Sequence, residues 1–328
     1  MIRSTTVKLL AALVAFAAGV GAVVTAALLA HSTLANARTS STGPQAAPAT
    51  SAASAPAPPS FPAPPAGALA LAREDRDLAV GLAVAHPAGK VLLQASVVGQ
   101  EQPASGLTVA FRPDGRGSVP AVECGPGCYR ATLDVAPHAI DVAVRGQGRR
   151  PSSVHFALPA SLPGPPAAAL VKRAETTWRH LRTLVVHDSL SSGPGTGIRT
   201  LWQFAAPNRL TYRIAKGPQA VVIGTRRWDK VPGGRWQTSQ ADPIPEPVPL
   251  WLSVSDAHLL GSTVVRGRPA WEASFFDPQI HAWFTIWVEK STMRTLELRM
   301  TAQAHFMHQV YGPFDAPVRI APPARGTT

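Results

Sequence analysis

Two adjacent polar residues, His187 and Asp188, are the first candidates for catalysis. The residues around them predict a β-strand over 184–190, and successive side chains of a strand point to opposite faces. The pair therefore cannot work as a base and its orienting acid. Three serines between positions 189 and 192 lie beside a Gly-Pro-Gly loop without a nucleophile motif, and no glycine-rich phosphate-binding motif is present. We predict that the chain is not an enzyme.

The segment His305-Phe-Met-His308 is the first candidate for metal binding. In a strand, His305 shares a face with Met307 and His308 lies on the other face, so the two histidines are not a chelating pair. His305 and Met307 would suit a soft ion such as Cu(I), but two ligands are few. The alternative is a surface histidine beside a methionine that packs under a loop. We predict no resident cofactor and keep copper as the metal to test.

Large aromatic residues are the first candidates for ligand binding, because aromatic-lined concavities hold apolar molecules well. All eight tryptophans lie between positions 178 and 287. The alternative is that they fill a core, since packed interiors use the same residues. The residues that we predict to line a ligand site are Trp178, Trp202, Trp251, Trp271, Trp283, Trp287 and Phe306.

The two cysteines, Cys124 and Cys128, enclose Gly-Pro-Gly. They could contribute to a metal site, but zinc sites require four ligands and the chain has no other thiol. An exported chain meets an oxidising compartment, and the turn residues bring the two Cα atoms close. We therefore predict a disulfide.

A long amphipathic hairpin over 281–311 is the strongest element that could position these residues. It reads as two antiparallel strands around a turn at 289–292. In the second strand, Leu296, Leu298, Met300 and Phe306 fall on one face, and Glu297, Arg299, His305 and Gln309 on the other. This period of two predicts a half-buried strand in a large sheet.

Other elements precede this hairpin. Apolar residues at helical spacing predict a helix from Leu170 to Val185. Pro249 to Leu260 predicts a short helical lid, and strands fill the intervals. Between Asp75 and Leu158, six short alternating segments separated by turns predict a small β-sandwich of immunoglobulin type. The predicted fold is mainly β with few helices.

The N-terminus predicts export. Arg3 and Lys8 precede 22 uncharged residues from Leu9 to Ala30, a run long enough to span a bilayer. We favour a retained single-pass anchor over a signal peptide cut after Ala37. The predicted segments are 1–37 (cytoplasmic stub and transmembrane anchor or signal peptide), 38–72 (Ala/Pro/Ser-rich linker), 73–158 (sandwich), 159–166 (linker) and 167–328 (C-terminal domain).

The net charge of +12 is spread along the chain and forms no dense run. Nucleic-acid binders usually carry a basic stripe with exposed aromatic residues, so we predict no nucleic-acid partner. Weak attraction to anionic lipid headgroups is compatible with this charge. The predicted location is the cell membrane with extracytoplasmic domains, or the exported pool if the leader is cut.

Two family resemblances add to these predictions. The order of strand, Pro-Ala-Gly, strand, hairpin and Gly-Cys-Tyr-Arg-Ala in the sandwich resembles small extracytoplasmic domains of the YtkA/FixH kind. Such modules often stand beside copper-handling proteins. This resemblance implies an alternative function in copper handling or resistance, with a membrane-embedded copper-transport partner.

The C-terminal domain resembles the LolA-like family of periplasmic lipoprotein carriers and their lipid-binding relatives. The matching stretches are Phe204-Ala-Ala-Pro-Asn-Arg-Leu-Thr-Tyr212, Val221-Val-Ile-Gly-Thr-Arg-Arg-Trp-Asp229, Trp287-Val-Glu-Lys-Ser-Thr-Met-Arg-Thr-Leu-Glu-Leu298 and Val310-Tyr-Gly-Pro-Phe-Asp-Ala-Pro-Val-Arg-Ile-Ala-Pro-Pro323. The resemblance implies an incomplete antiparallel barrel that is covered by helices and encloses a cavity for acyl chains. We therefore expect a membrane-anchored binding protein for a lipid, an acylated protein or another apolar ligand. A structural or sensor module of the cell envelope is a further alternative.

Overall fold

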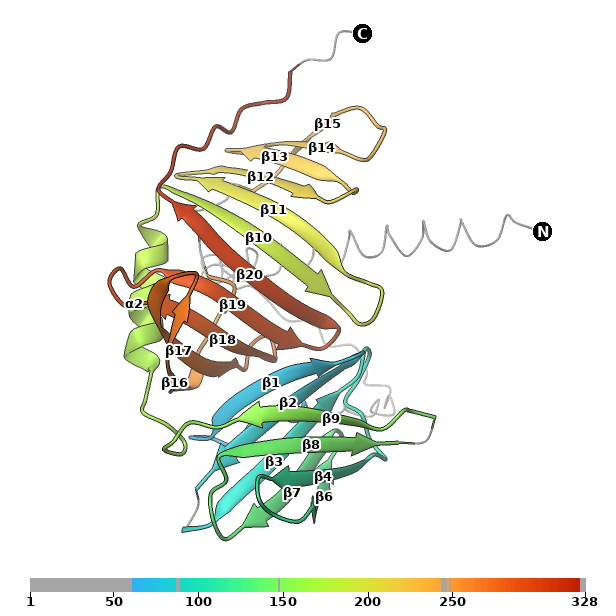
Figure 1. The fold of residues 1–328 in the computed structure, drawn as a ribbon. Helices are drawn as coiled ribbons and strands as arrows, with labels where there is room; N and C mark the ends of the chain where they lie inside the picture. Colours follow the sequence, from blue (N-terminus) through green and yellow to red (C-terminus); the bar gives the residue numbers. More distant parts are fainter. Residues whose placement is uncertain (1–60, 87–88, 147, 243–246, 248, 325–328) are drawn as a thin grey trace, which may run out of the picture. The chain divides into compact units, whose positions relative to one another are not determined.

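The computed structural model describes residues 61–86, 89–146, 148–242, 247 and 249–324. They form three antiparallel sheets and a helix, α2, as the mainly-β prediction requires (Figure 1). Within these ranges no helix is both long and apolar enough to cross a membrane. The predicted leader and most of the first predicted linker lie outside the described residues.

Nine strands form two sheets that share one core. The sheets have the orders β1-β2-β3-β7-β6 and β5-β4-β8-β9. Leu82 and Leu93 of the first sheet and Phe111 and Ile140 of the second are fully buried in the same cluster, so the sheets pack face to face. The strands are β1 (Leu69–Asp75), β2 (Leu78–Ala85), β3 (Val91–Val98), β4 (Thr108–Pro113), β5 (Val119–Pro120), β6 (Val122–Gly125), β7 (Cys128–Leu133), β8 (Ala139–Arg145) and β9 (Ser152–Ala157). β1 thus begins inside the range 38–72 that the sequence predicts as a linker.

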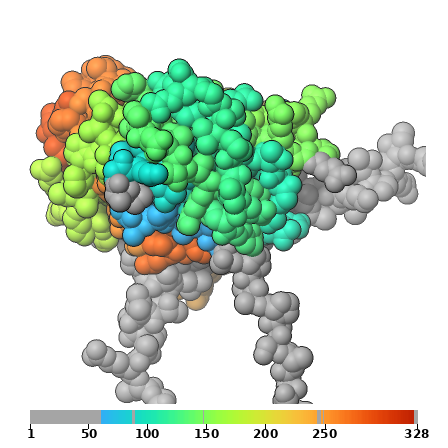
Figure 2. All heavy atoms as spheres, turned by 90° about the horizontal axis from the view of Figure 1, so that it is seen from below, coloured from blue at the N-terminus to red at the C-terminus, as the bar shows by residue number. Residues whose placement is uncertain are grey.

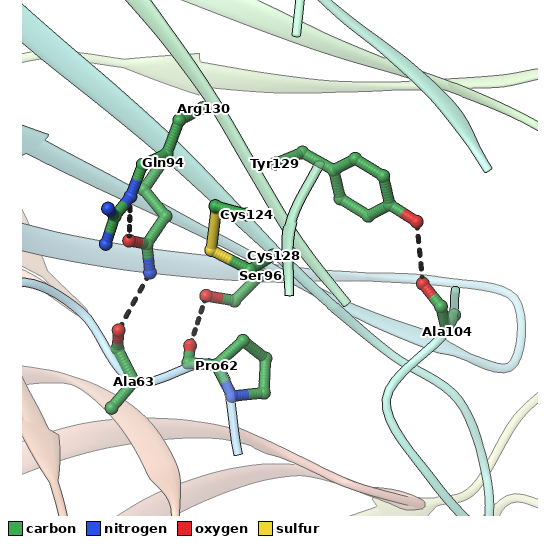
Figure 3. The surroundings of a disulfide bond; sticks show 9 residues. All are labelled: Pro62, Ala63, Gln94, Ser96, Ala104, Cys124, Cys128, Tyr129 and Arg130. Carbon is green, nitrogen blue, oxygen red and sulfur yellow. Dashed lines mark hydrogen bonds between the residues drawn. A yellow bond between two sulfur atoms is a disulfide. The ribbon is translucent and has the colours of Figure 1, made fainter. Parts of the chain in front are cut away.

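Four side chains stabilise the first sheet of this sandwich (Figure 3). Cys124 and Cys128 form the predicted disulfide across the β6–β7 turn. The amide of Gln94 donates a 2.7 Å hydrogen bond to the carbonyl oxygen of Ala63, and the hydroxyl of Ser96 donates to that of Pro62. The segment before β1 is therefore tied to β3.

The remaining strands form one 11-stranded antiparallel sheet with the order β15-β14-β13-β12-β11-β10-β20-β19-β18-β17-β16 (Figure 1). β15 and β16 are the two edge strands of this sheet, although they follow each other in the sequence. The strands are β10 (Thr183–Ser191), β11 (Ile198–Ala205), β12 (Arg209–Ile214), β13 (Gln219–Ile223), β14 (Arg226–Lys230), β15 (Gln237–Gln240), β16 (Ser255–Val265), β17 (Arg268–Asp277), β18 (Ala282–Glu289), β19 (Thr295–Ala302) and β20 (His305–Phe314).

The helical predictions need two corrections. α2 spans Ala168–Arg179 and ends well before Val185, because the β-branched run that starts at Thr183 joins the sheet as β10. The predicted lid over 249–260 is not helical. The residues up to Val254 are irregular, and those from Ser255 form β16, whose backbone pairs with β17 instead of forming helical hydrogen bonds.

The predicted hairpin over 281–311 is wrong in its second half. The chain reverses at Gln303 and Ala304, so that β19 and β20 form a second hairpin in which Ala302 pairs with His305. Ala304 has φ 55°, in the left-handed region. Met300 consequently pairs with Met307, and Thr301 with Phe306. After the turn, odd-numbered residues lie on the face that even-numbered residues occupy before it.

The sandwich and the large sheet pack against each other within the unit Pro58–Thr328. β1 contacts β16, β17 and β18, and Figure 2 shows the blue residues of β1 beside orange residues of the large sheet. Ala70, Ala79 and Val98 of the sandwich form one buried cluster with Phe276, Trp283 and Phe306. A Cβ on Gly81 would stand 2.6 Å from the Trp283 ring, so glycine permits this close approach.

Candidate functional site

One face of the large sheet, here called the helix face, packs against α2. The helix buries Leu170, Val171, Ala174 and Trp178 against it, in a cluster that contains Phe284. The neighbouring aromatic rings Phe275 and Phe284 stack with centroids 5.1 Å apart. The part of this face formed by β16–β19 is therefore filled by the protein's own side chains.

Trp251 covers the same part of the helix face. Its ring meets Phe275 and Phe284 edge-on, at 5.3 Å and 6.0 Å between centroids. Asp277, which is fully buried, holds the neighbouring backbone: its Oδ2 accepts the N–H groups of Leu252 at 2.6 Å and Ser253 at 3.1 Å. Its Oδ1 accepts the Ser253 hydroxyl at 2.8 Å and a further N–H from Gln279. A satisfied buried carboxylate thus anchors the segment that the sequence predicts as a lid.

The other part of the helix face carries half-buried aromatic rings. Trp202 on β11 pairs with Tyr212 on β12, and their rings are 4.9 Å apart. Phe204 stacks beside Trp202 at 6.4 Å. These three rings, here called the aromatic row, remain partly exposed although they lie on the same face as the fully buried residues under α2. At the end of the row the Arg227 guanidinium makes two hydrogen bonds to Asp229 and one to the Tyr212 hydroxyl.

A buried polar cluster adjoins the aromatic row. Asp188 on β10 pairs with Thr200 and with Gln309, and the Tyr311 hydroxyl donates a 2.5 Å hydrogen bond to the Gln309 amide oxygen. Burial raises the pKa of Asp188 to about 6, although Gln309 and Trp202 beside it favour the charged form. Burial also raises the pKa of Tyr311.

Several polar atoms in this region have no hydrogen-bond partner among the described residues. They are the Oδ1 of Asp188 and the indole Nε1 atoms of Trp178, Trp202 and Trp251. Trp178 meets Tyr311 edge-on at 4.9 Å, and the strand of Tyr311 is two strands from Trp202. Native structures rarely leave such groups unsatisfied without a reason.

The structure divides the seven predicted ligand-site residues between the two faces of the sheet. Trp178, Trp202, Trp251 and Trp271 lie on the helix face or pack on it. Trp283, Trp287 and Phe306 lie on the opposite face. Trp283 and Phe306 pack against the sandwich, and the Arg299 guanidinium lies 5.8 Å from the Trp287 ring. We leave these three out of the candidate site.

The two predicted copper ligands lie on the helix face. The Nδ1 of His305 is 3.1 Å from the backbone oxygen of Gln303, and Met307 packs against the core. Other histidines lie apart from them: His281 stacks on Phe61, His308 faces Glu297 and His155 faces Asp141. Among the described residues, no group of three or more His, Cys, Asp or Glu side chains is arranged to hold a metal.

The C-terminal half of the chain has structural counterparts. It is similar to LprF from Mycobacterium bovis, with 12% identity and a TM-score of 0.38 over 49% of this chain and 100% of that one. A DUF1329 family protein from Desulfovibrio piger has 11% identity and a TM-score of 0.25, covering 48% of this chain and 95% of that one. A putative outer membrane lipoprotein-sorting protein domain from Vibrio parahaemolyticus has 7% identity and a TM-score of 0.23, with 46% and 93% covered.

These similarities concern the fold of the C-terminal half alone and agree with the resemblance that its motifs indicate. No protein-family model and no curated protein matches the sequence.

Five residues near the candidate site are not predicted from the sequence as ligand-site residues: Asp188, Phe204, Tyr212, Gln309 and Tyr311. A signal for Asp188 was present, because it is the polar member of the series Leu184, Val186, Asp188 and Leu190 on one face of a predicted strand. Gln309 could not be predicted in this way, because the face of the sheet on which it lies depends on the turn at Gln303 and Ala304.

Proposed function

We propose that the protein is a non-enzymatic binding protein that holds an apolar molecule, such as a lipid or an acylated protein segment, against the aromatic row of the helix face. The observation that carries the proposal is the partial exposure of Trp202, Phe204 and Tyr212 on a face whose other part is fully covered. Contiguous apolar surface of this kind marks binding sites in soluble domains. Acyl chains are the ligand class that matches it.

The adjacent polar cluster would receive the polar end of the ligand. The Oδ1 of Asp188 and the indole Nε1 of Trp202 are buried near each other, and neither makes a well-aligned hydrogen bond with a described residue. A ligand with both a donor and an acceptor next to its apolar chain, for example a hydroxyl or an amide, would satisfy both groups. The fully covered part of the helix face, with Trp251 and Phe284, would act as a rigid wall.

Lipid retention by the full chain tests this proposal. The chain is purified in a mild detergent, exchanged extensively, and its retained lipid is extracted and quantified by mass spectrometry. We expect the wild type to retain lipid and Trp202→Ala to retain several-fold less. Trp228→Ala is the matched control, since Trp228 pairs with Val221 and so lies on the opposite face. Equal retention by the wild type and Trp202→Ala would exclude the aromatic row as the site.

A further inference from the structure

A second site lies on the face of the large sheet that points away from α2. There, β20, β10, β11 and β12 lie side by side (Figure 1) and form an open cleft of about 390 Å³. The side chains that alternate toward this face are His187, Ser189, Arg199, Leu201, Arg213, His308 and Val310. Neither the proposed apolar ligand site nor the packing against the sandwich uses them.

The strand register defines how these side chains are arranged. One row across the sheet runs through His308, Ser189 and Arg199, and the next through Val310, His187, Leu201 and Arg213. Directly opposite side chains on neighbouring strands stand about 5 Å apart at Cβ, and diagonal ones about 7–8 Å. The cationic and imidazole groups therefore surround a short apolar floor of Leu201 and Val310.

The charges of the cleft favour an anion. Arg199 and Arg213 are exposed and make no ion pair with any described residue. The nearest acid in the next strand, Glu297, already faces His308 at 3.2 Å and Arg266 at 3.8 Å. The carboxyl of Asp188 points to the helix face. Two guanidinium groups, the His187 imidazole and the Ser189 hydroxyl thus face one volume, at whose edge Glu297 engages His308.

We propose that this cleft binds the phosphate group of an anionic phospholipid headgroup. Guanidinium groups bind phosphate oxygens with paired hydrogen bonds, and the Ser189 hydroxyl adds a neutral donor. Leu201 and Val310 would contact the glycerol carbons. The lining has no Phe, Tyr or Trp on which a base could stack, which disfavours single-stranded nucleic acid. Headgroup binding would turn this face of the sheet toward the bilayer and leave the helix face accessible.

Histidine NMR of the full chain tests the proposal. The chain, labelled with ¹³C at its histidines, is held in non-ionic detergent and titrated with micelles that contain phosphatidylglycerol or phosphatidylcholine. We expect the ring signals of His187 and His308 to shift with phosphatidylglycerol only. At about 1 kcal/mol per arginine near an anionic surface, Arg199→Gln with Arg213→Gln should raise the required lipid fraction about 30-fold. Arg112→Gln with Arg145→Gln, exposed on the sandwich, is the equal-charge control.

Each outcome of this titration is decisive. Selective shifts that the control variant keeps and the cleft variant loses would support the proposal. An absence of shifts would overturn it, as would equal weakening in both variants, which would indicate a general charge effect. If inorganic phosphate, at the same total phosphate concentration as the lipid, caused equal shifts, the cleft would be a site for free phosphate. This result would contradict the proposal that it binds a lipid headgroup. Near-UV circular dichroism checks that the variants fold.

Discussion

At the scale of single residues, Asp188 has the most unusual environment in the candidate site. Its carboxyl is buried on an apolar face and its Oδ1 has no hydrogen-bond partner among the described residues. Ionisation of this group in the folded protein is therefore costly, and burial raises its pKa from 3.8 to about 6.

Stability should consequently depend on pH through Asp188. Because the folded-state pKa is raised, the contribution of Asp188 is fully present below pH 3.8 and is lost as the pH rises through about 6. At about 1.4 kcal/mol per pKa unit, the free energy of unfolding should fall by about 3 kcal/mol over this window. Asp188→Asn should lack this fall. Denaturant unfolding from pH 4 to pH 7 measures it, and parallel pH profiles of the two proteins would show that Asp188 is not responsible.

The alternation of buried and exposed side chains along a strand could be predicted from the sequence only where the ends of that strand could also be predicted. β4 and β9 alternate between buried and more exposed residues, and the opposite orientations of His187 and Asp188 agree with the prediction. Gln303 and Ala304 are not typical turn residues, so the sequence pattern of β19 continues through them without a break. One missed turn then exchanged the faces of Phe306 and Gln309.

At the scale of elements, the irregular segment around Trp251 depends on a single carboxylate. Asp277 accepts four hydrogen bonds, from Leu252, Ser253 and Gln279, without exposure to solvent. The segment that the sequence predicts as a helical lid is irregular, and its Trp251 packs into the core. Propensity does not reveal that a distant strand end supplies the acceptors for its backbone.

Replacement of this carboxylate should free the segment. In Asp277→Asn, an amide NH₂ replaces one acceptor oxygen and faces backbone N–H donors, which should lower the free energy of unfolding by about 3 kcal/mol. Hydrogen exchange of the peptide that contains Leu252 and Ser253 should become at least tenfold faster. Asp256→Asn, in β16, is the control for the same chemical change. Unchanged exchange in Asp277→Asn would show that other contacts hold the segment.

At the scale of the whole molecule, an apolar junction joins the sandwich and the large sheet within the residues described from Phe61 onward. Trp283 inserts beside Gly81, and Phe276 and Phe306 complete the contact with the sandwich. The sequence predicts the sandwich strands, the long sheet and a linker between them. The sequence does not predict this contact, because an aromatic residue such as Trp283 or Phe306 shows the same sequence pattern whether it faces a ligand, a core or a second sheet.

This junction should make the two parts unfold together. Trp283→Ala removes a nearly fully buried ring and should cost about 3–5 kcal/mol. We expect one unfolding transition for the wild type and two for Trp283→Ala, as measured by calorimetry. Trp228→Ala, in β14, is the control for loss of a tryptophan outside the junction. A single transition in Trp283→Ala at an unchanged temperature would mean that the junction contributes nothing.

Photo-crosslinking tests at residue resolution whether an apolar ligand lies on the aromatic row. The full chain in detergent is incubated with a diazirine-bearing fatty acid, irradiated and digested, and the labelled peptides are identified by mass spectrometry. We expect labels on β11 and β12 around Trp202, Phe204 and Tyr212, and competition by unlabelled fatty acid. Labels confined to other segments, or labels on these strands that no competitor removes, would contradict the proposed site.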